Sequence, residues 1–519
     1  MKPRDMGLLL DECAEAGVPT RVHLDRPFDV APDGTEVLEY GVAELAELVR
    51  EMAGWLAAAG VGRGDRVAIV KDSHWDYDLL ACAAVRVGAV PAQLSGRLAP
   101  DVLDVLLARL APAVLVTSTP YLAGLAFVAP RVIVLDGRVP GAIDVADLRG
   151  SRAPAPVRRG DDEPLVINHT SGTTGVPKLV VHSAGTIIGR LARFEAVRYP
   201  LIGVRRDDVL ANASDFAHGR TFCWTASALC LRPREIVIVS RHDADHADPV
   251  LRAHPPTIVE GLPATYVRFR ELTERLHNPF RRVRLFVSTY DAMHPPVMRA
   301  YLHATAHRRP LWMEGWGQTE TGPLSFRFRT RSSLVGHASS RNLGYPVPVR
   351  TRLRVVDPDT FDPLPRGHPG LVLARTRARC LDYVGESRRW RDKCAGEWWN
   401  TGDIGVHHRD GSVELLDREV DRVPGRSCLR TEDVVEDLLP EVVECVLLGR
   451  PAGPPLPVVV TADGTLDPVR WRTVVPDLPD PVVLTWDEVP RTGTGKVRRS
   501  ALLRQLTGTV ATSGSGRWT

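Results

Sequence analysis

Residues 165–181 decide the fold, and they read Leu165-Val166-Ile167-Asn168-His169-Thr170-Ser171-Gly172-Thr173-Thr174-Gly175-Val176-Pro177-Lys178-Leu179-Val180-Val181. The apolar runs at 165–167 and 179–181 predict two strands, and a loop of glycines and hydroxyls with one lysine joins them. Glycine lets backbone N–H groups turn toward an anion, and Lys178 adds positive charge. The loop therefore predicts a triphosphate site. It differs from a Walker A loop, in which the lysine directly follows glycine and opens a helix. The alternative is a polar hairpin turn.

The segments on both sides of this loop alternate between strands and helices. Upstream, apolar residues at helical spacing predict a helix over 42–59, stopped by Gly60. Further helices near 77–85 and 101–110 separate β-branched runs at 67–70, 114–117 and 132–135. Downstream, strands are predicted at 257–260 and 283–287, and helices at 264–276 and 296–306. Such alternation is typical of parallel sheets with crossover helices, so we predict an α/β fold with two similar lobes.

The pattern changes after residue 350. Shorter predicted strands at 352–356, 371–374 and 413–416 are punctuated by Pro and Gly, which indicates a smaller β-rich lobe. We predict a large N-terminal domain over 1–416 and a small α+β C-terminal domain over 417–506. Residues 507–519 are polar and aperiodic, and we expect a flexible tail there.

Composition excludes several classes of protein. The 519 residues are 44% hydrophobic, enough for a sizeable core, and 66 basic residues nearly balance 63 acidic ones for a net charge of +3. This balance predicts neither a nucleic-acid nor a membrane partner. The eight cysteines lack metal-ligand spacing and a disulfide framework, and no signal peptide or membrane span is evident, so we expect a cytoplasmic protein with reduced thiols.

Three more motifs contain chemically distinctive groups. Lysine occurs only at positions 2, 71, 178, 393 and 496 against 61 arginines, so a lysine within a motif is informative. The motifs are Glu314-Gly315-Trp316-Gly317-Gln318-Thr319-Glu320-Thr321, Thr401-Gly402-Asp403 and Pro490-Arg491-Thr492-Gly493-Thr494-Gly495-Lys496. A base can lie on Trp316, Glu320 offers a hard oxygen to Mg²⁺, and Asp403 can accept two ribose hydroxyls. Taken singly, each could equally be a buried Trp, a solvated Glu or a solvated turn.

The order and intervals of these motifs resemble the adenylate-forming superfamily of acyl-CoA and aryl-CoA synthetases, peptide-synthetase adenylation domains and luciferases. The resemblance runs from the Gly-Asp-Arg-Val-Ala segment at 64–68 to the Lys496 loop and Arg499. It implies that a carboxylate attacks the α-phosphate of ATP, that pyrophosphate leaves, and that a thiol of CoA or of a carrier protein accepts the acyl group. It also implies a C-terminal domain that rotates about a hinge near 417–421.

The resemblance assigns roles to individual residues. Lys496 bridges carboxylate and α-phosphate, Thr319 contacts the α-phosphate, Glu320 binds Mg²⁺, and Lys178 completes the catalytic set. The ATP-binding residues implied are Thr170, Ser171, Gly172, Thr173, Thr174, Gly175, Lys178, Glu314, Gly315, Trp316, Gly317, Thr319, Asp403 and Arg418. For the acid, Phe216, His218, Gly219 and Arg220 resemble the loop that closes an aromatic pocket in benzoate-CoA ligase-like members. We therefore expect an aryl or cinnamyl acid, with Arg220 facing a polar ring substituent or lying on the surface, and His218 in the pocket or simply in a loop.

Two departures leave other functions open. Val420 stands near the hinge position and the segment 423–426 is short, which weakens the case for thiol transfer. The stretch Ser288-Thr289-Tyr290-Asp291-Ala292 replaces a glycine-rich adenine wall. The second hypothesis is therefore an adenylating enzyme with a nitrogen acceptor, or one that activates another oxyanion, such as nitrite for attack by an aryl amine. The third is a non-catalytic nucleotide-binding relative.

Overall fold

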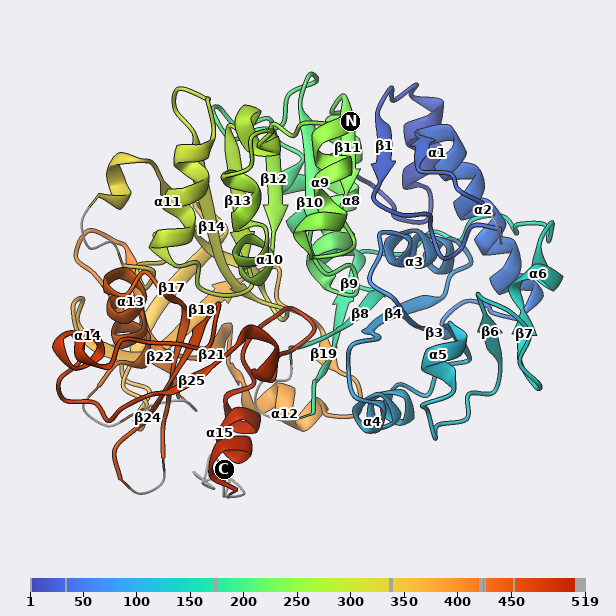
Figure 1. The fold of residues 1–519 in the computed structure, drawn as a ribbon. Helices are drawn as coiled ribbons and strands as arrows, with labels where there is room; N and C mark the ends of the chain where they lie inside the picture. Colours follow the sequence, from blue (N-terminus) through green and yellow to red (C-terminus); the bar gives the residue numbers. More distant parts are fainter. Residues whose placement is uncertain are drawn as a thin grey trace.

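The computed structural model describes residues 2–32, 35–171, 176–335, 339–419, 423, 426–450 and 453–508. Two α/β lobes lie side by side, and the β-rich lobe and the C-terminal elements cover one end of the second lobe (Figure 1). The predicted α/β class with two large lobes and a smaller β-rich lobe is confirmed.

The first lobe is built on a sheet that contains the phosphate-loop strands. In spatial order its strands are β19 (Asp382–Tyr383), β9 (Leu179–Ser183), β8 (Pro164–His169), β4 (Val90–Ser95), β3 (Arg66–Lys71), β5 (Val114–Thr117), β6 (Val132–Val134) and β7 (Ile143–Asp144). The strands from β8 to β7 are parallel, whereas β9 and β19 are antiparallel additions. The helices of this part are α1 (Leu9–Glu15), α2 (Val42–Ala58), α3 (Asp76–Arg86), α4 (Pro100–Leu110), α5 (Thr119–Leu122) and α6 (Val145–Leu148).

The second lobe combines the middle of the chain with its N-terminus. Its sheet runs β16 (Tyr345–Pro346), β15 (Gly322–Arg329), β14 (Leu311–Gln318), β13 (Leu285–Thr289), β12 (Ile258–Gly261), β10 (Val209–Ala213), β11 (Glu235–Ile238), β1 (Arg21–Leu24) and β2 (Glu39–Gly41). Its helical segments are the π-helix η1 (Gly185–Ala192), α7 (Arg193–Glu195), α8 (Gly219–Leu231), α9 (Ala244–Ala253), α10 (Pro263–Arg268), η2 (Arg270–Thr273), η3 (Pro279–Arg282), α11 (Pro295–Ala304) and η4 (Ser332–Leu334). The helix predicted over 264–276 is wrong in length, because a 3₁₀ turn follows α10. Its period of three residues keeps Phe269 and Leu272 on one buried face.

The β-rich lobe and the C-terminal domain follow. The antiparallel sheet of the lobe contains β17 (Thr351–Val356), β18 (Pro369–Thr376), β21 (Trp398–His407), β20 (Cys394–Ala395) and β22 (Val413–Arg418), and α12 (Ser387–Asp392) lies between β19 and β20 in the chain. The C-terminal domain contains α13 (Cys428–Leu438), β23 (Val442–Leu448), β24 (Leu456–Thr461), α14 (Pro468–Val474), β25 (Val482–Leu484), η6 (Trp486–Glu488) and α15 (Arg499–Thr507). The boundary predicted at 417 falls within β22, where Asp417 and Arg418 pair with β21. Most of the predicted tail lies outside the described residues.

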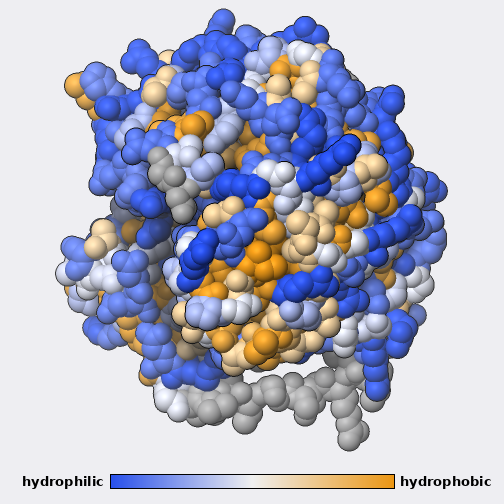
Figure 2. Space-filling model, turned by 90° about the vertical axis from the view of Figure 1, so that its right-hand side faces the viewer, coloured by the Kyte–Doolittle hydropathy of each residue, from blue (hydrophilic) through white to orange (hydrophobic). Residues whose placement is uncertain are grey.

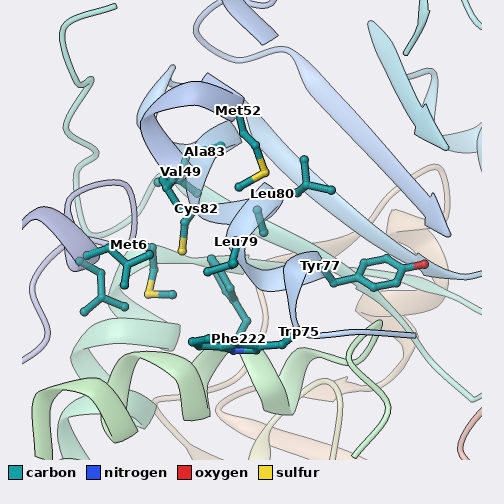
Figure 3. Packing of buried hydrophobic residues seen from close by; sticks show 14 of the residues in the cluster. Met6, Val49, Met52, Trp75, Tyr77, Leu79, Leu80, Cys82, Ala83 and Phe222 are labelled. Atoms are coloured by element: carbon teal, nitrogen blue, oxygen red, sulfur yellow. The ribbon is translucent and has the colours of Figure 1, made fainter. Parts of the chain in front are cut away.

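One hydrophobic core joins the two large lobes. Every residue of α3 is buried, and Leu79 and Cys82 lie in a cluster with Met52 of α2 and Phe222 of α8 (Figure 3). Full burial of one such side chain contributes about 1.5–3 kcal/mol. Because α3 belongs to the first lobe and α8 to the second, this packing fixes the position of one large sheet relative to the other.

The outer face of the first lobe is largely hydrophilic around a hydrophobic area (Figure 2). Within the described part of the chain, no helix is both long and apolar enough to cross a bilayer.

Candidate active site

A cavity of about 480 Å³ lies where the carboxyl ends of strands from both large sheets meet the β-rich lobe and the C-terminal domain. Its lining includes residues that directly follow parallel strands: Thr170 after β8, Tyr290 after β13 and Thr319 after β14. Open α/β sheets usually bind ligands at this edge, because the strand ends present loops to a common crevice.

Most of the predicted site residues line this single cavity. They are Thr170, Ser171, Lys178, His218, Gly219, Arg220, Glu314, Gly315, Trp316, Gly317, Thr319, Glu320, Asp403, Arg418 and Lys496. Gly172, Thr173, Thr174 and Gly175 lie outside the described residues. Phe216 needs a correction: its side chain is fully buried in the core shared by both lobes instead of lining the cavity, because Ala217 and His218 carry the chain from the core to the cavity.

A lysine, a carboxylate and a phenol form the centre of the predicted phosphate site. Lys178 Nζ lies 3.4 Å from Glu320 Oε1, and the Tyr383 hydroxyl donates to the same oxygen at 2.6 Å. Burial disfavours ionisation of Glu320, but Lys178 and the Tyr383 hydroxyl outweigh it, and the pKa of Glu320 lies below its ordinary value. Glu320 is therefore an ionised, buried oxygen ligand whose donor chemistry fits Mg²⁺.

Asp403 is held in the cavity wall by a polar network. Gln318 Nε2 donates to Asp403 Oδ2 at 3.2 Å and to the Thr401 carbonyl at 2.6 Å. Arg418 Nε lies 3.3 Å from Asp403 Oδ1. The network fixes the carboxylate at the cavity wall while it remains an acceptor for a diol.

The predicted platform for the base, at Trp316, is held in place by contacts of its own strand. Glu314, within β14, accepts a 2.7 Å hydrogen bond from Arg329 Nε. Trp316, on the same strand, packs against the core of the β-rich lobe and also lines the cavity. The predicted base platform is thus part of a strand, which holds it more firmly than a loop.

The Lys496 loop is docked on the N-terminal domain. Arg97 Nη1 donates to the Gly493 carbonyl at 3.2 Å, and Lys496 lines the cavity. Gly495 has a φ of +81°, and a Cβ there would lie 2.3 Å from the Cβ of Ala264. Glycine at 495 is therefore required for the close approach that delivers Lys496.

A second interdomain contact lies beside this loop. His294, at the start of α11, has Nδ1 2.8 Å from Glu436 Oε2 and 3.5 Å from Asp433 Oδ1 on α13. Burial raises the pKa of Glu436 to about 7, although His294 opposes the rise. Burial lowers the pKa of His294, but Glu436 and Asp433 outweigh it and hold that pKa well above its ordinary value. The pair therefore holds the C-terminal domain with a buried charge interaction.

Arg220 is neither a surface charge nor a free cation. Its guanidinium pairs with Glu195 at 2.5 Å and with Glu260 at 2.8 Å. One guanidinium between two carboxylates gives a net charge of about −1 when both are ionised. Glu195 lies just after the π-helix η1, an element that often marks functional sites.

His218 and Tyr290 lie in contact with each other in the wall of the cavity. Their rings meet edge to face, with centroids 4.7 Å apart and an interplanar angle of 88°. Burial, with help from His169 and Lys496, holds the pKa of His218 well below its ordinary value, so the imidazole is neutral. Burial likewise raises the pKa of the Tyr290 phenol. Neither His218 Nε2 nor the Tyr290 hydroxyl has a hydrogen-bond partner among the described residues.

A family model described as AMP-binding enzyme matches residues 21–383. The chain belongs to the AMP-binding enzyme family. This confirms the resemblance to adenylate-forming enzymes that the motifs indicated.

Individual relatives include two diazotases. The 3-amino-2-hydroxy-4-methoxybenzoate diazotase of Streptomyces cremeus is 36% identical, with 98% of this chain and 96% of that protein covered. The 3-aminoavenalumate diazotase of a Streptomyces species is 28% identical over 81% of this chain and 75% of that protein. A 4-hydroxybenzoate–CoA/benzoate–CoA ligase of Rhodopseudomonas palustris is 26% identical over 92% and 90%. The crystal structure of ATP-bound MatB from R. palustris has the same fold, with a TM-score of 0.77, 23% identity and coverage of 97% and 99%.

Several residues that line the cavity or contact its lining escaped the sequence interpretation. Lys393 is one of three cavity-lining lysines, and burial together with Lys178 lowers its pKa. The scarcity of lysine was a signal that could have identified it. Tyr383 and Glu195 had no such signal, because they reach the site through strand pairing and helix packing between distant segments.

Proposed function

We propose that this adenylate-forming enzyme activates nitrite with ATP and transfers the nitrosyl group to the amine of an amino-substituted aryl acid. The observation that carries the proposal is the similarity along almost the whole chain to the S. cremeus aminobenzoate diazotase. This is the second of the three hypotheses that the sequence left open, in which a nitrogen atom is the acceptor and the activated oxyanion is nitrite.

The proposed chemistry has two steps. A nitrite oxygen attacks the α-phosphorus of ATP, the bond to the β-phosphate oxygen breaks, and pyrophosphate leaves. The amine nitrogen then attacks the nitrosyl nitrogen, AMP leaves with the oxygen, and the amine loses a proton. The resulting nitrosamine shifts its second proton to oxygen, and this hydroxyl takes up the proton that the amine released, so that water leaves and the diazonium group remains. Electrons balance without an external oxidant.

The side chains of the cavity suit the first step. Lys178, with Thr170 and Ser171, would hold the outer phosphates, Thr319 would contact the α-phosphate, and Asp403 with Arg418 would hold the ribose. Glu320 would hold Mg²⁺, which neutralises phosphate charge when bound. Lys496 would lie between nitrite and the α-phosphate, where a compact ammonium can contact two oxygens.

The second candidate is adenylation of an aryl acid followed by transfer to CoA or a carrier protein. The apolar side chains of Ile187, Leu191 and Met313, which line the cavity, favour it because they could pack against a ring. The non-catalytic alternative is the weakest, since Lys178, Glu320, Asp403 and Lys496 line one cavity.

The test uses the purified full-length chain with ATP, Mg²⁺ and either nitrite or a panel of benzoates, with and without aminobenzoates and CoA. We expect pyrophosphate release that requires nitrite, and a diazo product by mass spectrometry when an aminobenzoate is added. Lys496→Ala should remove both, whereas Arg498→Ala, a matched loss of a neighbouring cation, should retain them. Pyrophosphate release that depends on a benzoate and not on nitrite would establish the second candidate instead.

A further inference from the structure

Tyr290 has a backbone conformation that tyrosine rarely adopts. It follows β13 directly, and its φ is +81°. This region favours glycine, and a bulky residue there is strained. Among the described residues, five other non-glycine residues have positive φ: Ala111 and Arg232 are helix C-caps, where such a conformation is common, and Leu201, Val349 and Phe361 are not. None of these five lines the cavity. Tyr290 instead lies in the loop that lines the cavity, so its strain lies at the candidate site.

The unusual backbone sends a large ring into the side of the cavity that the sequence assigned to the acid. The ring packs edge to face on His218, and the Arg220 guanidinium and Glu260 carboxylate are close enough to influence its pKa. Its hydroxyl makes no hydrogen bond to another described residue. Hydrogen bonds of the hydroxyl therefore do not explain why so large a residue stands in this conformation.

Arg220 lies in the remaining wall of this pocket. The donors of Arg220 are directed to Glu195 and Glu260, with Nε and Nη2 on Glu260 and Nη1 on Glu195. When both carboxylates are ionised, this cluster is a poor partner for a further anion of any size. Its charge therefore does not separate a benzoate from nitrite, and the steric effect of the Tyr290 ring carries the argument.

We propose that Tyr290 keeps the carboxylate of a ring-bearing acid away from the position beside His218 where the activated group is adenylated, so that only a small oxyanion is adenylated there. The aryl amine of the proposed reaction would bind elsewhere in the cavity, where Ile187, Leu191 and Met313 offer apolar side chains. A strained residue persists only where the surrounding structure holds it, and such residues gather at functional sites. This inference rests on the proposed function and names the residue that selects the activated group.

The test is Tyr290→Gly, which removes the ring and fits the backbone conformation. We expect its benzoate-dependent pyrophosphate release to rise at least about tenfold over that of the unmodified protein, the scale at which pocket shape separates substrates. Tyr290→Asn, a small residue that tolerates the left-handed region, should show the same gain and serves if the glycine variant folds poorly. Tyr290→Phe is the matched control: it retains the ring and should retain the preference for nitrite.

Two failures can be told apart. If the unmodified protein adenylates benzoates and not nitrite, the proposed function fails. If it uses nitrite, but neither Tyr290→Gly nor Tyr290→Asn gains activity with benzoates while both still bind ATP, the role of Tyr290 is wrong. An equal gain in Tyr290→Phe would also overturn that role, because the ring would then not be the barrier.

Discussion

Replacing His294 with glutamine should weaken the docking of the C-terminal domain in the pose that delivers Lys496. Breaking one partner out of a buried ion pair costs about 3–5 kcal/mol. We expect about 3 kcal/mol here, because Glu436 can take up a proton and keeps the 2.7 Å hydrogen bond from the Cys445 N–H. At 1.4 kcal/mol per factor of ten, this corresponds to roughly a 100-fold shift away from the docked pose.

The pKa shifts of the two groups predict whether docking of the C-terminal domain strengthens or weakens as the pH rises. The folded pKa of His294 lies above its ordinary value of 6.5, so its contribution is complete below pH 6.5 and is lost as the pH rises through the folded pKa. The pKa of Glu436 is raised from 4.5 to about 7, so between these two pH values its contribution to docking also falls as the pH rises. Asp433, Glu432 and Arg341 also face this contact. Docking should therefore weaken above neutral pH.

The assay is the initial rate of pyrophosphate release from pH 6 to pH 9, at saturating ATP. The unmodified protein should lose rate toward high pH through this pair, whereas His294→Gln should be slower at pH 6.5 and show a flatter profile. ATP affinity, which depends on the N-terminal domain, serves as the folding control. Identical pH profiles for the two proteins would refute the reasoning.

Three further substitutions test the site. Lys496→Ala should abolish adenylate formation, measured as pyrophosphate release, and should leave ATP binding, measured by calorimetry, largely intact. A collapse of ATP affinity would contradict the role assigned to Lys496. Tyr383→Phe removes the hydrogen bond to ionised Glu320, worth about 1.5–3 kcal/mol, and should raise the Mg²⁺ concentration needed for half-maximal rate. An unchanged Mg²⁺ dependence would argue against Glu320 as the ligand. Arg220→Met leaves Glu195 and Glu260 without their counter-charge and should destabilise the protein by about 3–5 kcal/mol. Stability should recover in part in acid, where the two carboxylates take up protons. Unfolding midpoints measured at pH 5 and pH 8 check this.

Local patterns were sufficient to predict the α/β order, whereas most of the cavity lining was predicted from the motifs. The phosphate loop and the segment 314–320 could be placed in one site only through the resemblance to adenylate-forming enzymes, because β8 and β14 belong to different sheets. Helix α2 and strand β5 were predictable because their periodicity and β-branched content are local properties.

Other features depend on contacts between distant segments. The pairing of Tyr383 with Glu320 requires β19 to join β9, about 200 residues earlier in the chain. The ion pairs of Arg220 need Glu195 and Glu260 from separate helical and strand segments. The departure of 288–292 from a glycine-rich pattern was visible, but the direction of the Tyr290 ring was not, because it follows from the backbone angle.

The place of β1 in the second sheet bears on how the nascent chain folds on the ribosome. Arg21 to Leu24 pair in parallel with Glu235 to Ile238, so this edge cannot form until both segments have been synthesised. At about 5–20 residues per second, the N-terminal strand waits on the order of 10–40 s for its partner. Strands β3, β4 and β5 find one another much sooner. Early trapping of the first forty residues by a chaperone or a bulky fusion tag would therefore impair the second lobe before the first.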